Sequence, residues 1–143
     1  LFVAYPTCVP NVGFGANSFA SNTSASDNTA LGSQSLDVNT PVASNTGVGR
    51  NALRANTTGT QNVAIGASTL DTNTTGGQNT AMGYAAMDNN TTGTQNTAVG
   101  GLALDANPTA HKKTSVGYDA LTTKTTGTTL SAIGQTGLAA KTK

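Results

Sequence analysis

Hydrophobic and polar positions follow one order that repeats every 17 residues from Asn11 to the end of the chain. Each copy places a large apolar residue at its fourth position and another at its ninth. The copies follow one another without insertion or deletion, so each predicts one copy of the same structural unit. The fourth position carries Phe14, Leu31, Val48, Ile65, Met82, Val99, Val116 and Ile133, and the ninth carries Phe19, Leu36, Leu53, Leu70, Met87, Leu104, Leu121 and Leu138.

This unit is too short for a pair of helices, which needs about 33 residues or more. Gly, Thr and Asn fill much of each copy, and all three are poor helix formers. Two short apolar phrases separated by turn-forming residues predict a coil of strand, turn, strand and turn. We therefore expect an all-β fold, a β-solenoid or β-roll of eight 17-residue coils with two short strands per coil, over residues 11–143. Stacked at the usual strand spacing of about 4.8 Å, the coils would form a rod about 38 Å long.

Two further columns are almost invariant. An unbroken glycine column indicates either a backbone angle that only glycine adopts readily or a contact too close for a Cβ atom. Stacked asparagine amides can hydrogen-bond to the copies above and below, so the twelfth position predicts an asparagine ladder, and the first position suits a second one. The fifth-position glycines are Gly15, Gly32, Gly49, Gly66, Gly83, Gly100, Gly117 and Gly134, and the ladder asparagines are Asn22, Asn39, Asn56, Asn73, Asn90 and Asn107, followed by Lys124 and Lys141.

The third and eighth positions are small, and each precedes a large residue. Neighbours on a strand point to opposite faces. We favour an arrangement with the large residues inside and the small ones outside. The reverse arrangement, with small residues inside a thin roll and large ones buried between chains, stays open. Either arrangement provides a regular surface for side-by-side association.

The composition excludes several classes of function. Only 9% of the residues are charged and the net charge is +1, which argues against a nucleic-acid binder driven by phosphate neutralisation. Cys8 is the single cysteine, so an internal disulfide framework and a cysteine-based zinc site are excluded. No apolar run approaches the length of about 20 residues that a membrane span needs. No combination of nucleophile, base and acid is evident, and His111, beside lysines, is expected to be a solvated turn residue, so we expect no enzyme and no cofactor.

Aspartates recur at the tenth position, at Asp37, Asp71, Asp88 and Asp105. Stacked carboxylates could bind calcium. Arg54 interrupts this column, and the glycine-aspartate spacing of calcium-binding β-rolls is missing. We therefore favour a solvated acidic face.

Glycosylation sequons of the form N-x-S/T occur at Asn22, Asn56, Asn73, Asn89 and Asn90. All except Asn89 share the twelfth position, so in a secreted protein they would form one stripe of N-linked sugar. The alternative is that a ladder of asparagines followed by threonines creates sequons by accident.

The two ends of the chain differ. Residues 1–10 form a half-coil, a cap or a segment that docks on another subunit, with Phe2, Val3, Tyr5 and Cys8 as the candidate interface. Residues 1–110 contain two Arg and five Asp, whereas residues 111–143 contain five Lys and one Asp. This difference favours head-to-tail docking of one chain on the next.

The phrases Asn79-Thr-Ala-Met-Gly-Tyr-Ala-Ala-Met87 and Asn96-Thr-Ala-Val-Gly100 resemble the head repeats of YadA-like trimeric autotransporter adhesins. They are also similar to the NTAVG repeats of fibre proteins from phages, algal viruses and environmental bacteria. The resemblance covers residues 11–143 and implies a left-handed β-roll, a trimer and display on a surface.

These observations lead to three hypotheses for function. The first is a non-enzymatic subunit or segment of an extracellular or cell-surface fibre, formed by axial stacking of coils. The second is a trimeric adhesin head or a viral or phage fibre module that binds a host surface, with host-surface glycans as partners. The third is an ice-binding solenoid. In the first two the main partner is the chain itself, and neither a nucleic acid nor a membrane is expected as a partner.

Overall fold

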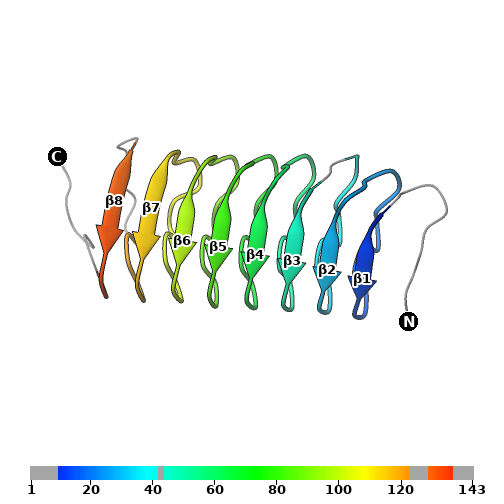
Figure 1. The fold of residues 1–143 in the computed structure, drawn as a ribbon, viewed down its shortest axis with the longest axis horizontal. Helices are drawn as coiled ribbons and strands as arrows, with labels where there is room; N and C mark the ends of the chain where they lie inside the picture. Colours follow the sequence, from blue (N-terminus) through cyan, green and yellow to red (C-terminus); the bar gives the residue numbers. More distant parts are fainter. Residues whose placement is uncertain (1–9, 42–43, 123–128, 137–143) are drawn as a thin grey trace.

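The computed structural model describes residues 10–41, 44–122 and 129–136, which wind into a rod of stacked coils (Figure 1). In these ranges each coil contributes one short strand and no helix occurs. The strands are β1 (Val12–Phe14), β2 (Thr29–Leu31), β3 (Thr46–Val48), β4 (Val63–Ile65), β5 (Thr80–Met82), β6 (Thr97–Val99), β7 (Lys113–Val116) and β8 (Leu130–Ile133).

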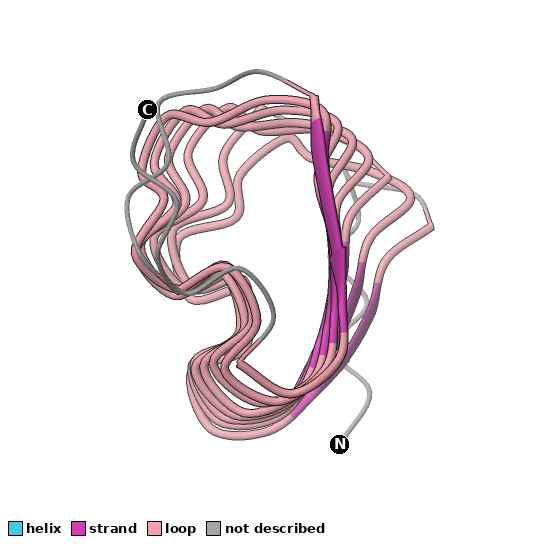
Figure 2. Cartoon of the chain, turned by 90° about the vertical axis from the view of Figure 1, so that its left-hand side faces the viewer, coloured by secondary structure: helices cyan, strands magenta, loops and turns pink. Residues whose placement is uncertain are grey.

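The strands form one parallel sheet in the order β1 to β8. Each residue pairs with the residue 17 positions later, as Ala64 pairs with Ala81 and Ile65 with Met82. The strands form one wall of the coil and turns form the rest (Figure 2). The predicted all-β solenoid with one coil per 17 residues is therefore confirmed.

The second apolar phrase of each coil is not a strand, so the expectation of two strands per coil was wrong for the described part of the chain. In the third coil, Asn51 has φ 61° and Leu53 has φ 54°. These are left-handed angles, whereas a parallel strand needs φ near −120°. The same angles recur at the seventh and ninth positions of the other coils wherever these residues are described, so this part of the coil is a series of turns.

The core consists of small residues at the third and eighth positions and large ones at the ninth. Ala64 and Leu70 are both fully buried, but Ile65 is 37% exposed and Met82 is 39% exposed. The expectation of large residues inside is thus right for the ninth position, but the small residues of the third and eighth positions lie inside as well, and Ile65 and Met82 on the strands face outward. The buried columns are Ala30, Gly47, Ala64, Ala81, Ala98, Ser115 and Ala132 on the strands, and Phe19, Leu36, Leu53, Leu70, Met87, Leu104 and Leu121 opposite them.

In the first coil the third and ninth positions compensate each other in volume. In the first coil the ninth position holds Phe19, the largest side chain of its column, and the third position holds Gly13. A Cβ atom on Gly13 would lie 3.0 Å from the Cδ2 atom of Phe19. The close packing of protein interiors explains this pairing, because a larger ring needs a smaller partner across a coil of fixed width.

Candidate functional site

The fifth-position glycines are structural, for both of the predicted reasons. Gly66 has φ 135°, and a Cβ atom on it would lie 2.5 Å from the carbonyl oxygen of Gly83 in the next coil. An L-residue rarely adopts this angle, and the backbone oxygen cannot move away without opening the sheet. The same angle range, 117–141°, holds for Gly15, Gly32, Gly49, Gly66, Gly83, Gly100, Gly117 and Gly134.

The twelfth position forms the predicted asparagine ladder from Asn39 to Asn90, whereas Asn107 donates to the Leu121 carbonyl instead. The Nδ2 atom of Asn56 donates to Oδ1 of Asn39 at 3.0 Å, and Asn73 donates to Asn56 at 2.7 Å. Asn90 donates in the same way to Asn73 at 2.7 Å. At the ends of the ladder, within the described ranges, the Nδ2 atom of Asn22 and the Oδ1 atom of Asn90 are buried without a hydrogen-bond partner.

The first position forms a second buried ladder beside the strands. The backbone amide of Asn62 donates to Oδ1 of Asn45 at 3.0 Å, and its Nδ2 atom donates to the carbonyl oxygen of Gly76 at 2.8 Å. The ladder continues to Lys113, whose backbone amide donates to Oδ1 of Asn96 at 3.0 Å. The Lys113 side chain is buried, and its Nζ atom donates to Oδ1 of Asn107 at 3.1 Å.

Burial of the twelfth position bears directly on the sequons. The side chains of Asn22, Asn56, Asn73 and Asn90 are buried, and those of the last three donate their amide protons inside the coil. An N-linked sugar is attached to that same amide nitrogen. The fold therefore leaves no room for the predicted stripe of sugar, and the ladder accounts for these four sequons.

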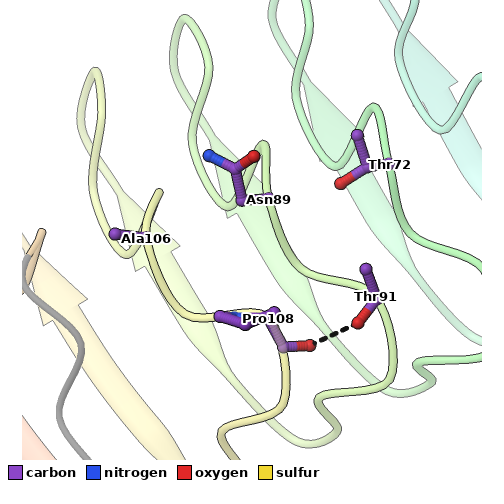
Figure 3. Close-up of a pocket in the computed structure, with 5 residues that line it drawn as sticks. All are labelled: Thr72, Asn89, Thr91, Ala106 and Pro108. Atoms are coloured by element: carbon purple, nitrogen blue, oxygen red, sulfur yellow. Dashed lines mark hydrogen bonds between the residues drawn. The ribbon is translucent and has the colours of Figure 1, made fainter.

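Asn89 is different, because its side chain is exposed and makes no hydrogen bond to any described residue. It stands at the eleventh position, on the edge of a cavity of about 430 Å³ between neighbouring turns (Figure 3). Thr72, Thr91, Ala106 and Pro108 complete the lining, and none of them is charged. The Thr91 hydroxyl donates to the carbonyl oxygen of Pro108 at 2.9 Å across the floor between two coils.

The tenth-position aspartates form a partly buried acidic column. Burial raises the pKa of Asp88, and the carboxylates of Asp71 and Asp105 raise it further, whereas Arg54 lowers it. Burial likewise raises the pKa of Asp105, as does Asp119. Arg54 does not merely interrupt the column, because its Nε atom pairs with Oδ1 of Asp71 at 2.7 Å. In the described ranges no group of three or more His, Cys, Asp or Glu side chains is placed to hold a metal ion.

His111 is half-buried, so the expectation of a solvated turn residue was wrong. Its Nδ1 atom accepts a hydrogen bond from the backbone amide of Thr94 at 3.0 Å and lies 2.8 Å from the Thr94 hydroxyl. The imidazole thereby joins two coils and has a structural role.

The outer face of the sheet combines apolar and hydroxyl side chains and carries no charge on its described strands. The fourth-position side chains point outward, with those at the second position, Thr46 and Thr80 among them, beside them on the same face. The exposed large residues of this face are Val12, Phe14, Leu31, Ile65, Met82 and Ile133. Exposed apolar side chains on one uncharged face make this face a candidate interaction surface.

The candidate interface at Phe2, Val3, Tyr5 and Cys8 lies outside the described residues. Comparison with protein-family models, curated proteins and solved structures gave no match. The resemblance to adhesin head repeats, and the left-handed coil that it implies, therefore stay predictions. No helix that could cross a lipid bilayer occurs in the part of the chain that the structure describes.

Proposed function

We propose that this chain is a non-enzymatic structural protein, a segment of an extracellular or cell-surface fibre that grows by stacking coils along one axis. The β-solenoid fold supports a fibre-like structural role. The observation that carries the proposal is that the two end surfaces of each internal coil are complementary to one another. The last coil of one chain can therefore pair with the first coil of another chain in the way that neighbouring coils pair within a chain.

This complementarity is visible in three sets of bonds that recur at each step of the rod. Between the fourth and fifth coils, the Val63 amide donates to the Asn79 carbonyl at 2.8 Å and the Gly83 amide to the Ile65 carbonyl at 2.8 Å. The Leu70 amide donates to the Ala86 carbonyl at 3.1 Å. A head-to-tail contact of this kind has no rotation that closes a ring, so it generates an open filament.

Electron microscopy and sedimentation of the purified full chain test axial stacking. The backbone amide of Ser131 in β8 occupies the place from which second-position residues donate to the next coil. Proline lacks this donor and is tolerated in an edge strand. We expect filaments from the wild-type chain and from Ser131→Thr, which restores the consensus residue, and none from Ser131→Pro. Discrete particles from the wild-type chain, or filaments from a folded Ser131→Pro variant, would contradict axial stacking.

A second candidate is a trimeric adhesin head or a viral or phage fibre module that binds host-surface glycans. The outer face of the sheet favours it, because Ile65 and Met82 stay exposed on an uncharged surface. Copies of the same chain share the same spacing between strands. Two such faces can therefore pack with their columns in register.

Light scattering and sedimentation distinguish the two candidates, since lateral packing gives a discrete oligomer. A double change, Ile65→Lys with Val99→Lys, places two charges on the sheet face without touching the core. We expect it to convert a lateral oligomer into monomers. The matched control is Thr58→Lys with Thr92→Lys, on an exposed turn. A wild-type monomer, or an oligomer that survives the face variant, would reject this candidate.

A further inference from the structure

We infer that Asn89 is the N-glycosylation acceptor of this chain and that the first sugar of its glycan lies in the cavity beside Pro108. Five sequons are present, and all five acceptor asparagines lie in the described ranges. Four of these asparagines are buried at the twelfth position. Asn89 alone combines a sequon, Asn89-Asn90-Thr91, with an exposed side chain.

The neighbouring pair Asn89 and Asn90 shows why the structure selects one sequon. Asn90 is buried, and its Nδ2 atom donates to Asn73 Oδ1 at 2.7 Å and to the Gly93 carbonyl at 3.2 Å. A sugar on that nitrogen would displace both bonds and would have to fit inside the coil. The backbone amide of Asn89 donates to the Asp105 carbonyl at 3.2 Å, which fixes the turn, while its side chain projects outward.

The cavity beside Asn89 suits a neutral sugar. Its volume of about 430 Å³ falls in the range of about 300–1,000 Å³ that ligand pockets occupy. Ala106 and Pro108 offer apolar atoms on which a sugar ring can pack, and the lining has no charged group (Figure 3). The opening faces solvent, so later sugars of the glycan extend away from the rod.

The reaction transfers an oligosaccharide to the Asn89 side chain, and the proposal places it in the secretory pathway of a eukaryotic cell. The Asn89 amide nitrogen attacks the anomeric carbon of a lipid-pyrophosphate-linked oligosaccharide. A C–N bond forms, the bond to the lipid pyrophosphate breaks, and the amide loses one proton. The assignment rests on the proposed extracellular location, whereas its test does not depend on fibre formation.

The test is peptide mass mapping of the full chain secreted from a eukaryotic cell, after enzymatic removal of glycans in heavy-oxygen water. Two variants separate the overlapping sequons. Thr91→Ala removes the sequon of Asn89 and keeps that of Asn90, whereas Thr92→Ala does the reverse. We expect modification of Asn89 in the wild-type chain and in Thr92→Ala, and its loss in Thr91→Ala. Because Thr91→Ala also removes a hydrogen bond, Asn89→Gln serves as a second variant.

A positive control makes a negative result decisive. Gln78→Asn places a new sequon ahead of Thr80 on an exposed turn with φ 58°, an angle that asparagine tolerates. Modification at this position but not at Asn89, or a sugar on Asn90 in folded protein, would overturn the assignment. For the cavity, the glycan is trimmed to one sugar. Magnetisation transfer between the protons of this sugar and those of Pro108 is expected in NMR spectra. Absence of this transfer would overturn the placement of the first sugar in the cavity. Failure of the fibre proposal would appear separately, in micrographs of unglycosylated protein.

Discussion

The Nδ2 atom of Asn73 lies 2.7 Å from Oδ1 of Asn56, one coil away, and both side chains are fully buried. Asn73 also donates to the carbonyl oxygen of Gly76 at 3.0 Å, and its own Oδ1 atom accepts from Asn90. Each amide thus joins its own turn to the coils on either side. A hydroxyl has one proton to donate and an aliphatic side chain has none, so neither can replace an amide that donates twice and accepts once. The ladder thereby couples all the coils that it crosses.

Asn73→Asp is expected to destabilise the rod strongly at neutral pH. The change keeps the shape of the side chain, but it leaves Asn56 Oδ1 without its donor, whereas the Gly76 carbonyl keeps Asn62 Nδ2 as a second donor. At about 1–3 kcal/mol for a buried acceptor left unsatisfied, the loss is about 1–3 kcal/mol. Burial would raise the pKa of the new carboxyl, so the stability of the variant should fall as pH rises through that pKa. Urea unfolding followed by circular dichroism at several pH values measures both effects.

Asn89→Asp is the matched control, because it makes the same chemical change at an exposed side chain without hydrogen bonds to described residues. Its free energy of unfolding should lie within about 0.5 kcal/mol of the wild-type value, as is usual for surface substitutions. Equal losses in the two variants would show that the ladder does not stabilise the rod.

The coil itself could be predicted from the sequence because every coil of a regular solenoid contains the same number of residues. Parallel strands in register require equal numbers of residues per coil, and the 17-residue spacing provides them. The second strand could not be predicted correctly. Leu53 is a typical strand residue, and nothing in its identity indicates φ 54°. Tertiary packing imposes that angle, because it turns the leucine into the core.

The glycines and asparagines were predictable because their roles depend on residue type alone. The burial of Asn73 could not be judged from its sequon, since the local sequence Asn-Thr-Thr reads as an exposed turn. Whether such an asparagine is buried depends on which side of the coil its side chain faces. Asn90 is buried although its neighbour Asn89 is exposed, and only the fold specifies which of the two side chains faces the interior.

Gly66→Ala is expected to cost about 3 kcal/mol or more. The added Cβ would lie 2.5 Å from the Gly83 carbonyl oxygen, and an L-residue at φ 135° adds about 1–3 kcal/mol of strain. The matched control is Gly77→Ala, at a position where other coils carry Thr60 and Thr94. Thermal unfolding should show a large loss of stability for the first variant and a small change for the second. Similar midpoints for both would refute the packing argument.

Asp88→Asn is expected to stabilise the rod at neutral pH. The pKa of Asp88 is raised by burial and by the carboxylates of Asp71 and Asp105, so the folded chain binds this proton more tightly than the unfolded chain does. Stability therefore falls as pH rises from the unfolded pKa, about 3.9, through the higher folded pKa. The variant should lose this part of the pH dependence in urea unfolding between pH 3 and 7.

Two variants check that assignment. Asp27→Asn removes an exposed carboxylate outside the acidic column and should leave the pH profile unchanged. Arg54→Gln removes the cation that lowers the pKa of Asp88, so it should steepen the loss of stability with rising pH. A profile for Asp88→Asn that coincides with the wild-type profile would show that the acidic column does not govern the pH dependence.

Lys113→Asn is expected to stabilise the rod by about 1–2 kcal/mol near neutral pH, in the range reported for consensus changes. Burial lowers the pKa of Lys113, so in the window below its ordinary value of 10.5 the folded chain binds fewer protons than the unfolded chain. Wild-type stability should therefore rise with pH through that window, and the variant should lack the rise. An asparagine fits the site, because Asn45 reaches Asn39 at 3.4 Å from the same position of an earlier coil. Lys112→Asn, at an exposed neighbour, is the control. Calorimetry between pH 7 and 10 measures the stability of each variant. A rise of stability with pH that persists in Lys113→Asn would show that another group causes it.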